Sequence, residues 1–375
     1  MDDFTPFLQI IHISDLHVCD PKSRNAVAMR GWVRKLRKRM PFMATLIEDG
    51  MAPHDPLAVN LFIKFLDEIT VQDSAWSKCS AWVVDTGDLT SLGDPDSLDL
   101  GRTYLNEVAK VCPQVASIYG NHDAWPGTLP LFAPNSAFES QPGVLTARHF
   151  TVAAPGLALR APIPHGGGEV LLYFVDSIRH GRWDNLLALG KVPDPQLDAL
   201  KTLIDQNHAP DRRDFRILAV HHPVHYPPPR KSTHMSMSND SDVAKVLDTP
   251  SPKGAYPLAH MVLSGHTHNL FPKHGELPLQ PSLCLHPDLG DEECQLVVGT
   301  LMQLDKYNKR KGWPHQCEVL RLYYSKSDSS VLLIERLLAA RKSGAAYRGT
   351  GIGPYEFVTL KPDNRAAEEI TFKVH

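Results

Sequence analysis

The feature that most constrains the fold of this chain is a set of five short polar clusters, each placed directly after an apolar, strand-like run. The most distinctive cluster is Gly120-Asn121-His122-Asp123, which follows the apolar run 115–119. The other four are Asp15-Leu16-His17, Asp85-Thr86-Gly87-Asp88, His221-His222-Pro223 and Gly265-His266-Thr267-His268. Because the carboxyl ends of parallel strands meet at one edge of a sheet, side chains that follow such strands converge there. The clusters therefore predict an α/β fold with one polar site at that edge.

Strand-like and helix-like segments alternate between the clusters, which is typical of a largely parallel sheet. Apolar runs predict buried strands at 8–13, 80–84, 115–119, 169–175, 215–220 and 260–263. Helical patterns lie between them, at 23–40, 56–70, 102–111, 195–207 and 240–247. The runs 296–300, 318–324 and 331–335 look like antiparallel strands, and we expect them to complete a second sheet packed on the first.

The overall composition is that of a soluble globular protein, with 42% hydrophobic and 22% charged residues among 375. A formal net charge of −3 gives no general reason to expect nucleic acid or an anionic membrane as a partner. Nucleic acid is therefore disfavoured, although a local basic patch is compatible with this balance. One such patch is the basic helix over 29–40, which has two interpretations. In the first, the helix attracts phosphate or a membrane. In the second, it is docked on the domain and its charged residues form an ordinary solvated face; we favour the second.

The six cysteines are scattered and include no Cys-x-x-Cys pair, which favours reduced thiols over disulfides or a thiolate metal site. The first residues are acidic and do not resemble a signal peptide. No run approaches the roughly 20 apolar residues that a membrane span needs. We therefore expect a cytoplasmic protein without a transmembrane segment.

Seven side chains in the clusters offer oxygen or nitrogen donors to a metal: Asp15, His17, Asp88, Asn121, His221, His266 and His268. This set contains no thiolate, so it suits Mn, Fe, Zn or Co. Seven ligands are too many for one tetrahedral ion and suit two divalent ions that share a carboxylate. Two ions about 3.5–4 Å apart clamp the attacking and leaving oxygens of an in-line displacement.

The charge of such a centre indicates the kind of substrate. Two divalent ions carry four positive charges, of which Asp15, Asp88 and a bridging hydroxide together neutralise three. The remaining charge, about +1, attracts an anionic phosphoester. We therefore expect a small phosphoester as the substrate.

In this order the clusters resemble the motifs of the calcineurin-like metallophosphoesterase superfamily. The pattern of that superfamily is Asp-x-His, Gly-Asp, Gly-Asn-His-Asp/Glu, His, and Gly-His-x-His, and each part is present between residues 10 and 270. The resemblance implies a four-layer sandwich of two mixed β-sheets flanked by helices. It implies one catalytic domain over 1–375, with the core motifs in 8–270 and residues 271–375 completing the second sheet.

The resemblance also implies roles for the matching residues. One ion would be held by Asp15, His17 and His268, the other by Asn121, His221 and His266, with Asp88 as the bridge.

His122 is not a ligand in this family; it would face the substrate and stabilise or protonate the leaving oxygen, with Asp123 orienting or charging its ring. Only one of the adjacent His221 and His222 can be a ligand, and the family spacing His-x-Pro selects His221. His222 is then expected at the rim of the site or behind the ligands.

Other residues near the clusters have open interpretations. Asp85 is either an acceptor behind the ligands or a turn residue, and His12 is interpreted as a core histidine with a backbone partner. Five residues contact either the substrate or neighbouring loops: Trp125, Arg179, His180, His225 and Tyr226.

The predicted function is phosphoester hydrolysis by a dinuclear metal centre, with a bridging hydroxide as the nucleophile. The Ser14-Asp15-Leu16-His17 opening is most similar to phosphodiesterases that accept cyclic nucleotides or small diesters. A nuclease is the first alternative and a phosphomonoesterase the second. A metal-stabilised scaffold without catalysis is disfavoured, because every ligand position and His122 are filled.

Overall fold

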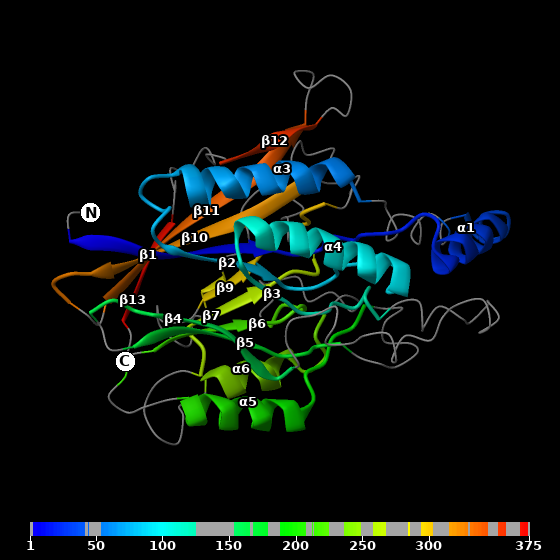
Figure 1. Cartoon of the computed structure of the whole chain (residues 1–375). Coiled ribbons are helices and arrows are strands. Elements are labelled where there is room, and N and C mark those ends of the chain that lie inside the picture. The colour runs from blue at the N-terminus through cyan, green and yellow to red at the C-terminus, as the bar shows by residue number, and fades with distance from the viewer. Residues whose placement is uncertain are drawn as a thin grey trace.

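The structure is a computed structural model, shown in Figure 1. It describes residues 3–41, 44, 54–124, 154–165, 168–178, 188–207, 212, 214–224, 236–248, 258–267, 284–285, 294–302, 315–328, 331–343, 352–357 and 368–373.

Within these residues, seven strands form one mixed sheet in the order β12-β11-β10-β1-β2-β3, and β13 also pairs with β11. The strands are β1 (Phe4–Ile13), β2 (Ser80–Asp85), β3 (Gln114–Ser117), β10 (His315–Ser325), β11 (Val331–Ser343), β12 (Ile352–Phe357) and β13 (Glu368–Lys373). The strands β1, β2 and β3 are parallel to one another, while β10 is antiparallel to β1. One side of this sheet, from β1 to the edge strand β3, thus has the parallel arrangement that the alternating pattern predicted.

The second mixed sheet has the order β4-β5-β6-β7-β9-β8 among the described strands. They are β4 (Gly156–Pro162), β5 (Glu169–Phe174), β6 (Phe215–Ala219), β7 (Met261–Ser264), β8 (Cys284–Leu285) and β9 (Cys294–Val297). The strands β5, β6, β7 and β9 are parallel, and β4 and β8 close the two edges in the antiparallel sense.

Alternating side chains of each strand build three layers of core. On β1, Ile10 belongs to the core between the two sheets, where it is grouped with Ile217 of β6. The next residue, Ile11, lies on the opposite face of the sheet and packs with Phe62 and Leu105. Both faces of the sheet are buried, which explains why its strands are almost continuously apolar.

Helices cover the outer face of each sheet (Figure 1). On the first sheet these are α3 (Pro56–Asp67), extended by the π-helical turn η1 (Glu68–Gln72), and α4 (Pro95–Val111). On the second they are α5 (Asp194–Asn207) and α6 (Asp240–Asp248). The expected four-layer α/β sandwich of two mixed sheets is thereby confirmed.

The strands after residue 270 do not complete a single second sheet, and this part of the prediction is wrong. β9 extends the second sheet beside β7, whereas β10 to β13 extend the first sheet beside β1. Leu320 and Leu322 of β10 enter the core between the sheets. The partner of a strand is decided by such long-range packing, which the local pattern of residues does not reveal.

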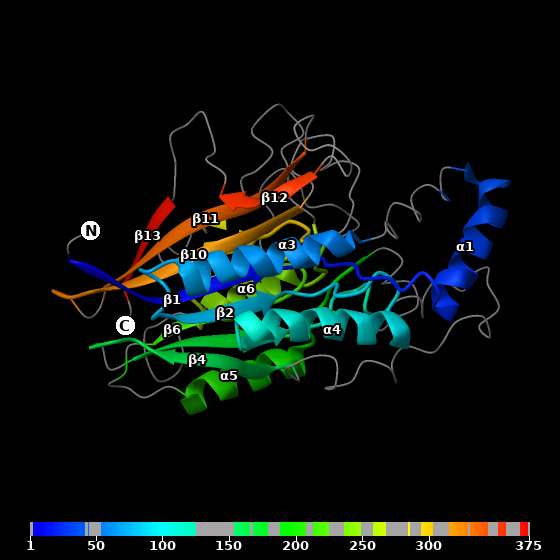
Figure 2. The same ribbon diagram turned by 45° about the horizontal axis from the view of Figure 1, so that its top comes forward.

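Helix α1 (Arg24–Arg37) follows the loop after β1 and lies beyond the carboxyl ends of β1 and β2 in both views (Figures 1 and 2). Its apolar side is docked: Met29 and Val33 are buried and pack with Leu92 of the loop after β2. None of the described helices is both long and apolar enough to span a bilayer.

Candidate metal centre

The predicted site residues come from both sheets and meet where the strands end. Asp15 and His17 follow β1, Asp88 and Asn121 follow β2 and β3, and two further histidines follow β6 and β7. The structure brings together six of the seven predicted ligands: Asp15, His17, Asp88, Asn121, His221 and His266. The seventh, His268, lies outside the described residues.

The separations between donor atoms fit shared metal ions. His17 Nε2 lies 3.8 Å from Asp15 Oδ1 and 3.7 Å from Asp88 Oδ2. His221 Nε2 approaches the same Oδ2 atom of Asp88 to 3.4 Å. Two ligand atoms that are each about 2.1 Å from one ion lie about 3.0–3.4 Å from each other. The His221–Asp88 separation falls in this range, and the two separations of His17 are wider than it. All of these side chains are at most 1% exposed.

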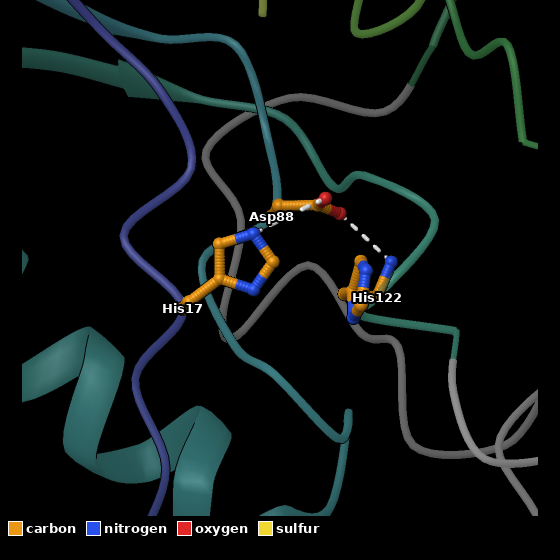
Figure 3. Close-up of side chains that lie close together, drawn as sticks. All are labelled: His17, Asp88 and His122. Atoms are coloured by element: carbon orange, nitrogen blue, oxygen red, sulfur yellow. Dashed lines mark hydrogen bonds and ion pairs between the residues drawn. The ribbon is translucent and has the colours of Figure 1, made fainter. Parts of the chain in front are cut away.

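Asp88 belongs to two groups of potential ligands. The first group is His17, Asp88 and His122, drawn in Figure 3; the second is Asp88, His221 and His266. In each group the ligand atoms all lie within 4.8 Å of one another. A carboxylate common to two groups is what a bridge between two ions requires.

The groups around the Nε2 atom of His221 favour a positive charge at that atom. Its Nδ1 lies 2.9 Å from the carbonyl oxygen of Thr86, which can only accept, so Nδ1 carries the hydrogen. In the neutral ring Nε2 then has a lone pair, which faces Asn121 Oδ1 at 3.0 Å and His266 Nδ1 at 3.1 Å. Burial lowers the pKa of His221, but the Asp88 carboxylate outweighs burial and raises this pKa to about 9. A proton or a metal cation can meet the same demand, and the donor set suits a metal.

Four of the predicted ligands have a left-handed backbone that non-glycine residues rarely adopt. The φ angles are 55° at Asp15, 51° at His17, 54° at Asp88 and 68° at His266. Such conformations cost on the order of 1 kcal/mol or more each and cluster at functional sites. The strand-end loops thus turn sharply to aim these side chains inward.

The glycines of three clusters lie against residues of other clusters. A Cβ atom at Gly120 would lie 2.2 Å from Asp88 Oδ1, and one at Gly265 would lie 1.8 Å from Ser14 Oγ. Gly87 has a φ of 111°, and a Cβ atom there would lie 2.8 Å from His221 Nδ1. Glycine is required at these positions because the neighbouring loop occupies the space of a side chain.

The hydrogen bonds of Asp123 in the described part of the chain go to the neighbouring loops, and its expected action on the His122 ring stays a prediction. Its carboxylate accepts hydrogen bonds from the backbone of Leu89, Thr90 and Gly120 and from the Thr90 hydroxyl, two at each oxygen. The Nδ1 atom of His122 instead lies 3.1 Å from the carbonyl oxygen of Ser91. A carboxylate oxygen has few lone pairs, and these are engaged by the loop donors, so Asp123 holds the loop after Asp88 against the Gly120 turn. Burial, then the nearby Asp88 charge, raises the pKa of Asp123 to about 7.

His222 lies behind the predicted ligands, which is one of the two positions expected for it. Its Nδ1 is 2.8 Å from Ser177 Oγ, and its ring centroid is 4.1 Å from that of His266. Burial, and then the neighbouring His266 and His221, hold the pKa of His222 well below its usual value. His222 therefore stays neutral and supports the His266 ring.

Sequence reasoning missed Thr300, which supports the first cluster from behind. Its hydroxyl donates to the carbonyl oxygen of Asp15 at 2.7 Å, and Leu301 N donates to that of Ser14 at 3.0 Å. Both residues lie in a short segment after β9, far from the clusters in the chain. No motif signals this contact; only the fold reveals it.

Sequence reasoning also missed a row of buried charged and polar side chains that lie beside β1 and contact one another. Arg336 of β11 is paired with Glu318 of β10, whose Oε2 lies 3.3 Å from His12 Nδ1. His12 Nε2 lies 3.2 Å from the Thr86 hydroxyl, and the carbonyl group of that residue holds His221. The expectation of a backbone partner for His12 is therefore wrong. The available signal was a glutamate and an arginine among the apolar residues of β10 and β11, since buried charges are paired.

Asp85 acts as a turn residue, one of its two expected roles. Its carboxylate accepts from Gly87 N at 3.2 Å and from Ser117 Oγ at 2.6 Å, which joins the ends of β2 and β3. Burial raises its pKa well above the usual value. Trp125, Arg179, His180, His225 and Tyr226 lie outside the described residues.

Comparison with known proteins identifies the family. The calcineurin-like phosphoesterase family matches residues 8–270, and the chain belongs to this family. The family assignment drawn from the five clusters is thereby confirmed.

One solved structure with a similar arrangement is the sulfate thiohydrolase SoxB of Thermus thermophilus in complex with glycerol. It has 12% sequence identity and a TM-score of 0.40. The match covers 84% of the present chain but only 54% of the SoxB chain, so this protein spans about half the length of that one. A search of the curated proteins found no match.

Proposed function

We propose that this protein is a metal-dependent phosphodiesterase that uses two divalent ions at the ends of its central strands. The observation that carries the proposal is that Asp88 belongs to two groups of donor atoms, one with His17 and His122 and one with His221 and His266. The atoms within each group lie within 4.8 Å of one another. The chemistry of the donors, imidazole nitrogen with carboxylate and amide oxygen, suits Mn, Fe, Zn or Co.

The residues that would hold the ions follow from the cluster pattern. One ion would be held by Asp15, His17 and His268, the other by Asn121, His221 and His266, and Asp88 would bridge them. When bound, such a pair supplies an activated water and neutralises charge on the phosphate. His221 rather than His222 is assigned as the ligand, because His221 Nε2 faces Asp88 and the ring of His222 is engaged with Ser177.

His122 is assigned to the leaving group. Its Nδ1 faces the carbonyl oxygen of Ser91, which only accepts, so Nδ1 keeps its hydrogen and Nε2 is the atom that exchanges a proton. The ring lies 4.6 Å from that of His17, and its backbone nitrogen donates to Asp88 Oδ1 at 2.7 Å. An imidazole fixed beside the centre in this way can protonate a departing oxygen.

The buried charges support an anionic substrate. Asp15 and Asp88 are the two carboxylates assigned to the ions. The four positive charges of two divalent ions exceed the three negative charges of these carboxylates and one hydroxide. A diester, with one negative charge, matches a residual charge of about +1 better than a doubly charged monoester does. This match favours the phosphodiesterase over the phosphomonoesterase alternative.

We further propose that the chain acts as one catalytic domain. Residues of β1, β5 and β10 share a single core between the sheets, for example Ile10, Leu172 and Leu320. Four described cysteines are free thiols, in keeping with a cytoplasmic location.

Hydrolysis of two synthetic substrates tests the proposal. Metal-stripped protein is supplied with Mn²⁺ and given bis(4-nitrophenyl) phosphate, a diester, or 4-nitrophenyl phosphate, a monoester. We expect Mn-dependent cleavage with preference for the diester, lost in Asp88→Asn and retained in Asp198→Asn, an exposed aspartate of α5. Preference for the monoester would indicate a phosphatase, and two bound ions without turnover of either substrate would contradict the proposal.

The role of His122 has its own readout. Nitrophenolate leaves without protonation, whereas the ribose oxygen of cyclic AMP does not. His122→Ala should therefore slow cyclic AMP hydrolysis by about 10²–10⁴-fold and nitrophenyl diester hydrolysis much less. An equal loss with both substrates would rule out proton donation by His122.

A further inference from the structure

A local excess of positive charge lies in and around helix α1. Residues 22–39 contain eight lysines and arginines and no acidic residue. The rest of the chain then has 31 basic and 42 acidic residues, a net charge of −11. The overall charge of −3 averages over this asymmetry, so it does not describe the surface that a partner would meet.

Six basic side chains between residues 30 and 39 face the solvent. Its apolar side is covered, with Met29 1% and Val33 3% exposed. The exposed residues include six cations: Arg30, Arg34, Lys35, Arg37, Lys38 and Arg39. Within the described part of the chain, no carboxylate forms an ion pair with Arg30, Arg34 or Lys38, which follow one another at four-residue spacing along one face.

Helix α1 is anchored beside the candidate metal centre. It follows the Asp15 and His17 cluster directly, and it packs on Leu92, four residues after Asp88. The backbone nitrogen of Asp20 donates to Ser97 Oγ of α4 at 3.0 Å, which fixes the loop that enters α1. Helix α1 is thus held beyond the edge of the sheets where β1 and β2 end (Figures 1 and 2).

We propose that the exposed basic face of α1 binds the phosphate backbone of a nucleic acid. From Arg30 to Lys38 the helix rises about 12 Å, and a duplex carries about seven phosphates over that length. Arginines present a planar fork of donors that matches a phosphate.

A membrane surface is a weaker fit than a nucleic acid. Helices that lie in a membrane interface bury an apolar face among the lipids. The apolar face of α1 is already packed on the protein, and its solvent face holds only one exposed large apolar residue, Val27. The interaction available to a partner is therefore electrostatic. This inference goes beyond the proposed function, because it concerns binding and does not depend on hydrolysis.

The test measures binding of a fluorescein-labelled 20-base-pair DNA duplex to the full chain in EDTA, by anisotropy. Contact with about four phosphates predicts a slope near −3.6 for log affinity against log salt. We expect the double variant Arg30→Glu/Arg34→Glu to bind at least tenfold more weakly. The matched control, Lys64→Glu/Lys110→Glu, changes the net charge equally at exposed positions on α3 and α4 and should stay within twofold of wild type.

The outcomes separate the alternatives. Equal weakening in both double variants, or no salt-dependent binding by wild type, would overturn the proposal. Tight binding to vesicles containing 30% phosphatidylserine, without binding to the duplex, would assign α1 to a membrane instead. Circular dichroism confirms that the variants fold, and Arg30→Gln/Arg34→Gln should be intermediate. Hydrolysis of bis(4-nitrophenyl) phosphate tests the proposed function separately, because that substrate is too small to contact the basic face of α1 as well as the metal centre.

Discussion

The pair of Arg336 and Glu318 allows a quantitative prediction. The Glu318 side chain is fully buried and that of Arg336 is 8% exposed. Burial raises the pKa of Glu318, but the Arg336 charge, with help from His12, outweighs it and leaves the pKa below its usual value. Arg336→Leu would leave this carboxylate in the core beside His12 without its main counter-charge. Removal of one partner of a buried pair costs about 3–5 kcal/mol.

The free energy of unfolding can be compared by urea denaturation of the metal-stripped proteins, followed by tryptophan fluorescence. The matched control is Arg160→Leu, the same chemical change in an arginine that is 49% exposed and 3.8 Å from Glu169. A pair this exposed contributes about 1 kcal/mol or less. The double variant Glu318→Leu/Arg336→Leu, which leaves no buried charge, should regain most of the lost stability.

The loss of stability in Arg336→Leu should also depend on pH and be larger at high pH than at low pH. Without Arg336, burial raises the pKa of folded Glu318 above its unfolded value of about 4.3. The destabilisation is then greatest at pH values above the pKa of Glu318 in the folded variant. It disappears as the pH falls towards the pKa of Glu318 in the unfolded chain. The gap between wild type and Arg336→Leu should therefore narrow from pH 7.5 to pH 5. The reasoning fails if Arg336→Leu costs no more than Arg160→Leu, or if the double variant is no more stable than Arg336→Leu.

Three further predictions concern the support of the metal centre. Gly120→Ala should weaken Mn²⁺ binding by at least tenfold in calorimetric titration, because the new methyl group would displace Asp88; Gly31→Ala, in open space on α1, should bind normally, and equal affinity in both variants would refute the steric argument. Thr300→Val removes the hydroxyl group that holds the Asp15 carbonyl, so the melting temperature should fall by an amount equivalent to about 1 kcal/mol; an unchanged melting temperature would count against this bond. EDTA should lower the melting temperature of wild type, because Asp15 and Asp88 are then buried without metal, and the decrease should be smaller in Asp88→Asn.

Much of the fold was predictable because its central strands are short, buried on both faces and separated by amphipathic helices. The clusters around Asp15, Asp88 and Asn121 were found for the same reason: each directly follows such a strand. Where the pattern is local, sequence and structure agree: the helix predicted from residue 56 begins there in the structure, where Asp55 caps α3 and Pro56 lies in its first turn.

The parts that were missed depend on contacts between distant segments. The placement of β10 beside β1 is set by packing in the shared core, and the local residues of β10 suit either sheet. The bond from Thr300 to Asp15 joins positions 285 residues apart. The backbone donors of Leu89 and Thr90 reach Asp123 from another loop, and its place beside His122 in the sequence does not reveal these contacts.

The close contacts of Gly87, Gly120 and Gly265 have a consequence for how such a protein can change over evolutionary time. Each glycine is required by a residue of a different cluster, so a side chain introduced in one loop displaces a predicted ligand, or the residue beside one, carried by another. The clusters therefore constrain one another, and a substitution at one of these glycines requires a compensating change in another loop. New specificity must be acquired at the periphery, through segments that do not contact this interlocked centre.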